Sequence, residues 1–464
     1  MIHSEIENKK NKSIKNVELE IQNNSKFVYI IQPTFHKMDG KLVKGFSLGS
    51  CPLELPQMAG AVPGDWKKSC CHEYFEDINY NSDASVVFIT SPSNDILHAR
   101  DIIVRFKENG EKKVIFGGHE DTFSESILGE VADSFYRGIP DKNDMQTMLD
   151  DALDDDLKGN YDFGHNFNYP YDYSVFEGKN VNYIHVQGSA GCLFKCEYCR
   201  HPSASNGGEY KLRDIDCIVE DLKSIKKLTK FIAFKDPNFF NSKKHLIELC
   251  NRIIKENLGI LWGAQMPIYV GDDKKILKLM RKAGCRVIYI GFETMNQKNL
   301  DSVNKPFKVK KYVPLVRNIQ KEGIRVVGYF MFGFDYDTKE SFEQVYSFVR
   351  ESRIAYPLVN ILTPVPGTPI FERMKMEGRL DLPDAETFKK VHPLYSIPCN
   401  HAYFDPKLMS RKEIEDNFMK LSKKLSTFKE IFRRSFYRFN VLSFIFLKMN
   451  LEFRRDHQRM ELHY

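Results

Sequence analysis

Three cysteines, Cys192, Cys196 and Cys199, lie within eight residues of this chain and have the spacing C-x3-C-x2-C. Three thiolates on one short loop can bind three irons of a [4Fe–4S] cube and leave the fourth iron without a protein ligand. Clusters that only transfer electrons normally use four cysteines. The spacing therefore predicts a cluster whose open iron binds a small molecule and takes part in chemistry.

Other roles for these cysteines fit the sequence less well. A closed zinc site needs four ligands, and His201 is close enough to be the fourth, but ligands so near in sequence rarely complete a tetrahedron. The chain has no second C-x2-C pair. A disulfide requires an oxidising compartment, and the polar N-terminal residues contain no apolar signal-peptide region. Zinc binding and inert cysteines remain the alternatives to the cluster.

The composition is that of an ordinary globular protein. The chain has 464 residues, enough for two or three domains, and 42% of them are hydrophobic. The 68 basic residues nearly balance the 62 acidic ones, so no nucleic-acid-binding stripe is indicated. The longest apolar stretch, 441–447, is too short to span a bilayer. The remaining cysteines show no metal-ligand spacing, and a reducing cytoplasm is the expected location.

Between residues 27 and 140, patterns typical of buried strands alternate with helical patterns. We expect strands at 27–31, 85–90, 113–116 and 134–138, and helices at 53–62, 96–109 and 124–131. This alternation predicts a doubly wound, Rossmann-like α/β domain, in which ligands bind beyond the carboxyl ends of the strands. Those ends carry Ser91, Ser93, Gly117, Gly118 and His119.

From residue 181 to about 380 the alternation resumes as six strand–helix units. The expected strands are 181–186, 231–234, 261–265, 287–293, 325–332 and 358–362. Six such units predict a partial (β/α)6 barrel, whose functional groups lie at the carboxyl ends of the strands. The residues found there are Asp236, Asn238, Gln265, Glu293, Gly333 and Gly367.

These patterns divide the chain into five expected segments. They are a polar tail at 1–26, the α/β domain at 27–145, an acidic and Asn/Tyr-rich linker at 146–180, the barrel at 181–380 and a helical C-terminal region at 381–464. In the last segment, 411–436 is amphipathic and 436–453 mixes aromatic residues with arginines. We expect this region to pack against the barrel, and a helix lying on a membrane surface is the alternative.

The cysteine loop, with the aromatic Tyr198 before its last cysteine, resembles the signature of the radical S-adenosylmethionine (SAM) superfamily. The preceding α/β domain, and Asp236, Asn238 and Phe239 after the second barrel strand, resemble the cobalamin-binding branch of that superfamily. The resemblance implies that SAM binds the open iron and is cleaved to a 5′-deoxyadenosyl radical. It also implies base-off cobalamin without a histidine ligand, because the chain lacks an Asp-x-His-x-x-Gly motif.

The resemblance also implies roles for individual residues. Cys192, Cys196 and Cys199 would hold the cluster, and Asp236 and Asn238 would contact the SAM amino group. Glu293 would contact the ribose or the methionine part of SAM. Further cofactor contacts would come from Tyr198, Gln265, Gly333 and Gly367 in the barrel, and from Ser91, Ser93, Gly117, Gly118 and His119 around cobalamin.

The implied enzyme methylates an unactivated carbon, or a phosphorus, of a lipid or secondary metabolite. A cobalamin-dependent cyclase or rearrangement enzyme is the alternative. A tRNA methylthiotransferase would need three more widely spaced cysteines, which Cys51, Cys70 and Cys71 do not provide. A non-catalytic iron–sulfur or zinc scaffold would not need Asp236 and Glu293. The expected partners are a small-molecule or lipid substrate and a flavodoxin- or ferredoxin-type electron donor, without nucleic acid; a membrane surface is a further possibility.

Overall fold

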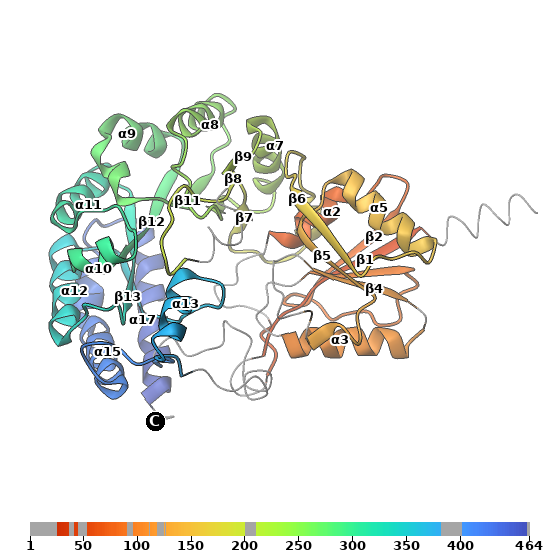
Figure 1. The fold of residues 1–464 in the computed structure, drawn as a ribbon. Coiled ribbons are helices and arrows are strands. Elements are labelled where there is room, and N and C mark those ends of the chain that lie inside the picture. The colour runs from red at the N-terminus through yellow and green to blue at the C-terminus, as the bar shows by residue number, and fades with distance from the viewer. Residues whose placement is uncertain are drawn as a thin grey trace, which may run out of the picture. The chain divides into compact units, whose positions relative to one another are not determined.

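The computed structural model describes residues 26–36, 41–44, 53–90, 96–110, 112–117, 125, 127–199, 210–381 and 401–461. The chain divides into two compact units, and the boundary in the described residues falls between Asn182 and Tyr183. Each unit is built on a six-stranded sheet with helices packed against it (Figure 1). The expected fold class, a Rossmann-like α/β domain followed by a partial barrel and C-terminal helices, is confirmed.

The sheet of the first unit is entirely parallel, with the order β2-β1-β3-β4-β5-β6. Its strands are β1 (Phe27–Gln32), β2 (Lys67–His72), β3 (Val86–Thr90), β4 (Lys113–Gly117), β5 (Ser134–Ile139) and β6 (Asn160–His165). Every residue of β1 and β3 is buried, as expected for central strands covered on both faces. The order reverses between β1 and β3, which is where doubly wound sheets bind their ligands.

Helices α2 (Glu54–Ala61), α3 (Ile96–Glu108) and α5 (Lys142–Leu153) cover this sheet. Ala99, Ile102, Ile103 and Phe106 form one stripe of α3 at helical spacing, and each is at most 1% exposed. They pack on the inward side chains of β1, β3 and β4. Burial of each large side chain contributes about 1.5–3 kcal/mol, so this stripe fixes α3 on the sheet.

Two parts of the first unit differ from the expectation. Residues 146–180, expected to be a linker, contain the second half of α5, strand β6 and the short helix η1 (Tyr173–Phe176). The Asp141 side chain begins α5 by accepting hydrogen bonds from the N–H groups of Asn143 and Asp144. Strand β2 was not predicted because it is an edge strand whose first residues are exposed and charged.

The sheet of the second unit follows sequence order and is also parallel. Its strands are β7 (Ile184–Val186), β10 (Phe231–Phe234), β11 (Leu261–Gln265), β12 (Cys285–Glu293), β13 (Arg325–Phe332) and β14 (Tyr356–Ile361). Helices α7 (Ile215–Ile225), α8 (Lys243–Lys255), α9 (Lys274–Lys282), α11 (Tyr312–Lys321) and α12 (Lys339–Ser352) lie around it (Figure 1). With α13 (Pro369–Met376) after β14, these elements make up the six strand–helix units expected of a partial barrel.

The C-terminal region folds into α15 (Arg411–Leu425), α16 (Phe428–Ser435) and α17 (Val441–Glu461). Phe446 of α17 is buried together with Val327 and Ala355 of the barrel. The Asn450 amide donates a hydrogen bond to the Ala355 carbonyl (3.0 Å). The C-terminal helices therefore pack against the barrel, as expected, and no helix in the described part of the chain is long and apolar enough to cross a membrane.

Candidate cluster and cofactor site

The cysteine loop leaves the barrel directly after β7. Strands β8 (Ser189–Ala190) and β9 (Lys211–Leu212) pair antiparallel and close the base of the loop. Cys192 and Cys199 are partly exposed, Cys196 is buried, and all three are free thiols. The Cys199 N–H donates to the Cys196 carbonyl (3.0 Å), so the last two cysteines lie on one turn. The three thiols are thus presented at the carboxyl end of the barrel.

Two other barrel loops hold the cysteine loop in place through its backbone. The Glu197 N–H donates to the carbonyl of Val303, which follows the short helix α10 (Gln297–Ser302). The Glu197 carbonyl accepts from the N–H of Ile370 in α13 (Pro369–Met376). Both bonds are 3.1 Å long. The loop is therefore fixed between the segments that follow β12 and β14.

The thiols of Cys192, Cys196 and Cys199 fit the ligands of an iron–sulfur cube that is held by three cysteines. Each cysteine of a cube binds a different iron, so the thiols need not converge on one point. In the described ranges no three His, Cys, Asp or Glu side chains are grouped to hold a single metal ion. His201, the fourth ligand that a zinc site would require, lies outside those ranges.

A buried ion pair links the end of β12 to the cysteine loop. Lys305 Nζ lies 2.8 Å from Glu293 Oε1, and the two side chains are only 11% and 9% exposed. Lys305 also donates to the Tyr198 hydroxyl (3.1 Å). Glu293 has a φ of +63° at a β-bulge, a conformation that costs about 1–3 kcal/mol in a residue other than glycine. The surrounding contacts thus hold Glu293 in a strained position.

The Lys305 ammonium also affects the thiols. Burial alone lowers the pKa of Lys305, but the Glu293 carboxylate and Cys196 outweigh it, so that this pKa is raised. Burial raises the pKa of Cys196, whereas Lys305 and a hydrogen bond with Tyr198 act in the opposite direction. Since a nearby cation stabilises a thiolate, Lys305 favours the form of Cys196 that binds iron.

Asp236 ties the end of β10 to the segment that leads into the cysteine loop. It is 2% exposed, and its carboxylate accepts from the Gly188 N–H (2.8 Å) and the Ser189 hydroxyl (2.7 Å). Burial raises the pKa of Asp236 to about 7, although these hydrogen bonds and the charge of Arg213 oppose the shift. Asp236 is therefore a buried acceptor beside the loop.

Arg213 also stabilises the segment that leads into the cysteine loop. Its guanidinium pairs with Asp221 at 2.5 Å, and neither side chain is exposed. It also donates to the Gln187 carbonyl (3.3 Å), two residues before Ser189. Arg213 and Lys305 were not expected from the sequence because neither lies in a recognisable spacing, and Lys305 is twelve residues beyond its partner Glu293.

The other polar candidates have different surroundings. Asn238 stabilises its own turn by accepting from the Phe240 N–H (3.0 Å), and its amide donates to Asn241 (2.5 Å). Gln265 is exposed at the carboxyl end of β11, where it is paired in register with Tyr289. Gln265 is thus the candidate among these whose side chain is open to a ligand.

The candidate glycines serve mostly in close packing. A Cβ atom on Gly333 would lie 2.5 Å from the Phe404 ring, and one on Gly117 would lie 2.2 Å from the Tyr136 carbonyl. Gly367, with a φ of +82°, has open space around it. Four candidates of the first unit, Ser91, Ser93, Gly118 and His119, lie outside the described residues.

Comparison with known proteins defines the class of this site. Residues 186–349 match the model of the radical SAM superfamily. Bacteriochlorophyllide d C-12(1)-methyltransferase of Chlorobaculum tepidum is 31% identical over 258 residues, which are 54% of this chain and 53% of that protein. The C-8(2)-methyltransferase of the same organism is 26% identical over 83% of this chain and 90% of its own. The chain thus spans about half the length of the first relative and most of the second.

The fold agrees with that assignment. The cobalamin-dependent SAM radical enzyme OxsB, solved with aqua-cobalamin and SAM, superposes with a TM-score of 0.70 over 95% of this chain and 72% of its own, at 13% identity. The barrel of this chain is a radical SAM domain, which implies a [4Fe–4S] cluster and SAM. Residues 186–349 therefore form a radical SAM domain, and the chain shares the fold of OxsB.

Proposed function

We propose that this protein is a cytoplasmic, cobalamin-dependent radical SAM methyltransferase. Its substrate would be an unactivated carbon, or a phosphorus, of a lipid or secondary metabolite. The observation that carries the proposal is the three-cysteine loop at the carboxyl end of the first strand of a radical SAM barrel. Both relatives described above are named methyltransferases, and the second aligns with 83% of this chain.

The candidate residues of the barrel would have separate roles in binding the cluster and SAM. Cys192, Cys196 and Cys199 hold the cluster, which together with SAM supplies the radical chemistry. Asp236 offers a buried acceptor for the SAM ammonium, a charge-assisted contact. Glu293, which is paired with Lys305, would contact the ribose or methionine part of SAM. Asn238, Gln265 and Gly367 would complete the pocket wall, whereas Gly333 packs against Phe404.

The first unit would bind cobalamin, which supplies the methyl transfer. Its sheet has the strand order of doubly wound domains, whose ligands lie beyond the carboxyl ends of the strands. Gly117 ends β4 at that edge. In the sequence, Gly118 and His119 follow β4, and Ser91 and Ser93 follow the neighbouring strand β3. Without a corrinoid histidine motif, we expect base-off cobalamin.

Three other functions are less well supported. A cobalamin-dependent cyclase or rearrangement enzyme would use the same cofactors without methyl transfer. A tRNA methylthiotransferase would carry an RNA-binding β-barrel at its C-terminus, whereas α15, α16 and α17 make this region helical in the described residues. A scaffold without catalysis leaves the strained, buried Glu293–Lys305 pair beside the thiols unexplained.

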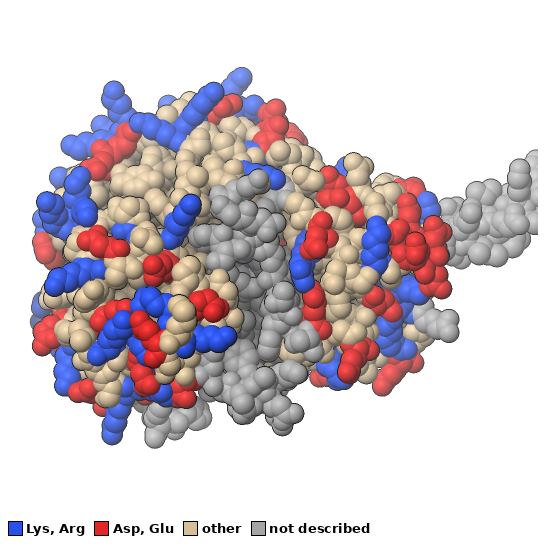
Figure 2. Space-filling view, viewed as in Figure 1, with Lys and Arg blue, Asp and Glu red and all other residues tan. Residues whose placement is uncertain are grey.

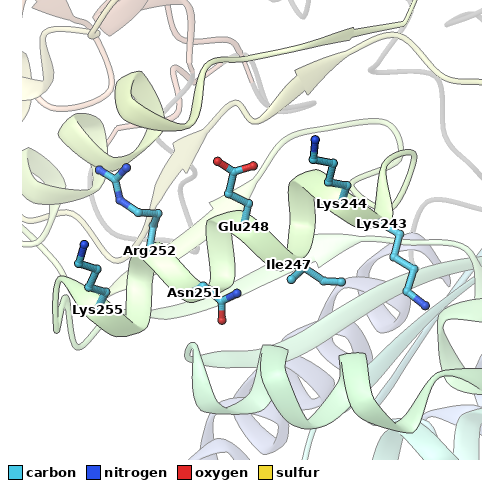
Figure 3. Close-up of a pocket in the computed structure, with 7 residues that line it drawn as sticks. All are labelled: Lys243, Lys244, Ile247, Glu248, Asn251, Arg252 and Lys255. Atoms are coloured by element: carbon cyan, nitrogen blue, oxygen red, sulfur yellow. The ribbon is translucent and has the colours of Figure 1, made fainter.

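Radical SAM enzymes need an external electron donor, and we propose that a flavodoxin or ferredoxin docks beside the cysteine loop. Lys243 and Lys244 begin α8, whose outward face is drawn in Figure 3, and Lys274 and Lys275 begin α9. Figure 2 shows basic side chains gathered over this part of the barrel. Cations at helix N-termini oppose the helix dipole, and neither helix has an acidic residue in its first turn. Helix stability therefore does not explain these lysines.

The same lysines adjoin the exposed part of the cysteine loop. Asn241, just before α8, donates to the Gly191 carbonyl (3.5 Å), and Lys243 pairs with Asp273 at the start of α9 (2.6 Å). Next to them, Leu193 is 59% exposed and Tyr269 is 38% exposed. An apolar centre with a basic rim suits a small acidic electron carrier.

Product analysis with SAM labelled in its methyl group tests the proposed reaction. The protein is reconstituted anaerobically with cobalamin and incubated with a lipid extract as the source of substrate. It should release 5′-deoxyadenosine and S-adenosylhomocysteine, about one of each per labelled methyl group found in the product. The Cys192→Ala/Cys196→Ala/Cys199→Ala variant should lose about four irons and all 5′-deoxyadenosine. Release of 5′-deoxyadenosine with an unlabelled product would favour the cyclase alternative. Full iron retention by the triple variant would refute the cluster.

A further inference from the structure

An exposed aromatic patch lies where α16 meets α17. We define it by Phe432, Phe436, Phe439, Val441 and Phe444. Phe432, Phe439, Val441 and Phe444 are 50%, 77%, 75% and 55% exposed. The rings contact one another, with centroids 5.5 Å apart for Phe432–Phe436, 6.0 Å for Phe436–Phe439 and 5.7 Å for Phe439–Phe444. Water-soluble proteins rarely expose so many large apolar side chains together unless the patch binds something.

Packing within the fold does not account for this patch. The barrel already covers the other side of α17, through Leu442, Phe446 and Met449. The first half of α17 is therefore apolar on both sides, a pattern found in helices that are covered all round. Among the described residues nothing covers the outward side chains of the patch, so a binding partner is expected to supply that cover.

The charges around the patch indicate the kind of partner. Residues 428–455 contain seven lysines and arginines, of which Arg434 is buried, but only two glutamates, of which Glu430 is buried. Arg438 is exposed beside Phe439. A surface depression continues along α17 from the patch and is lined by Phe444, Leu447, Lys448, Leu451, Glu452 and Arg455. Apolar side chains flanked by basic ones are typical of protein faces that bind anionic lipid.

We propose that the aromatic patch binds the surface of an anionic lipid membrane. The phenylalanine rings would enter the boundary between head groups and acyl chains, and Arg438, Lys448 and Arg455 would contact lipid phosphates. A second copy of this chain is a less suitable cover, because a two-fold interface would bring the same arginines of both copies together. This inference does not depend on the proposed reaction.

Vesicle flotation of the full chain tests the proposal directly. The wild-type protein should float with vesicles of phosphatidylcholine and phosphatidylglycerol, and much less with phosphatidylcholine alone. Phe439→Ser/Phe444→Ser should reduce the bound fraction on anionic vesicles at least about tenfold, since each buried ring contributes strongly to insertion. Arg438→Gln/Lys448→Gln/Arg455→Gln should give a similar loss and remove the salt dependence of binding.

Met376→Ser/Leu408→Ser is the matched control, because these apolar side chains are 82% and 57% exposed outside the patch. It should float as the wild type does, and circular dichroism should show all variants folded. The proposal is overturned if the wild type does not bind anionic vesicles, or if the patch variant binds as well as the control. Sedimentation that shows a dimer abolished by Phe439→Ser/Phe444→Ser would assign the patch to a second copy instead.

Discussion

At the scale of single residues, Lys305 distinguishes this site from a loop that merely carries three thiols. Its ammonium touches both the Glu293 carboxylate and the Tyr198 hydroxyl, and its charge opposes the rise that burial causes in the pKa of Cys196. One buried cation thus connects the expected SAM contact to the cluster ligands. Because the pair is buried, loss of one partner leaves an uncompensated charge that costs about 3–5 kcal/mol.

We predict that Lys305→Met lowers the reduction potential of the reconstituted cluster. The substitution removes a positive charge beside Cys196, and a less positive environment disfavours the added electron. The cluster content should be retained, and SAM binding should weaken. Potentiometric electron paramagnetic resonance measures the potential without turnover.

Lys308→Met is the control, since Lys308 is three residues away and its side chain is 58% exposed. Lys305→Arg, which retains the charge, should restore much of the potential. If Lys305→Met folds and has the wild-type potential, Lys305 has only a structural role.

At the scale of elements, α17 has two faces with different energetic roles. Phe446 is 2% exposed against the barrel, whereas Phe444, two residues earlier on the same helix, is 55% exposed. Arg325 of β13 donates to the Ser443 hydroxyl (3.0 Å) and the Ser435 carbonyl (3.2 Å), which fixes the start of α17 on the sheet. The inner face therefore contributes to stability, and the outer face does not.

We predict that Phe446→Ala lowers the free energy of unfolding of the barrel unit by about 3–5 kcal/mol, because it leaves a cavity in the core. Phe444→Ala on the outer face should change it by no more than about 0.5 kcal/mol. Urea unfolding followed by tryptophan fluorescence is suitable, since Trp262 is buried in β11. Equal destabilisation by the two substitutions would contradict the packing of α17 described above.

At the scale of the whole molecule, basic and acidic residues are nearly equal in number, but lysines are concentrated on one part of the barrel surface. The lysines at the starts of α8 and α9 lie on the side of the barrel where the cysteine loop is exposed. Steering by such a surface can raise the association rate with an acidic partner about 10- to 1,000-fold. The overall net charge of +6 does not reveal this arrangement.

We predict that Lys244→Glu/Lys274→Glu/Lys275→Glu raises the KM for reduced flavodoxin at least about tenfold at low ionic strength. SAM cleavage driven by dithionite, which needs no docking, should remain near the wild-type rate. Lys412→Glu/Lys420→Glu/Lys429→Glu, on exposed positions of α15 and α16, carries the same charge change and should leave the KM for flavodoxin unaltered. An unchanged KM in the first variant would exclude this docking surface, whereas absence of dithionite-driven cleavage in the wild type would contradict the proposed reaction itself.

The sequence by itself determined the features that depend on local pattern. The cysteine spacing, the central strands of both sheets and the six strand–helix units follow from residues close together in the chain. Strand β6 was missed within the expected linker because an edge strand is defined by the neighbour it pairs with, here β5, and not by its own polar sequence.

Only the tertiary structure decided how the site is assembled. Lys305 and Tyr198 are 107 positions apart in the chain, and Asp236 and Gly188 are 48 apart. Gly333, expected to admit a ligand, instead packs beneath Phe404. Such contacts have no local signature, because the barrel brings distant strand ends together, and burial between them then determines which charges are paired and which pKa values shift.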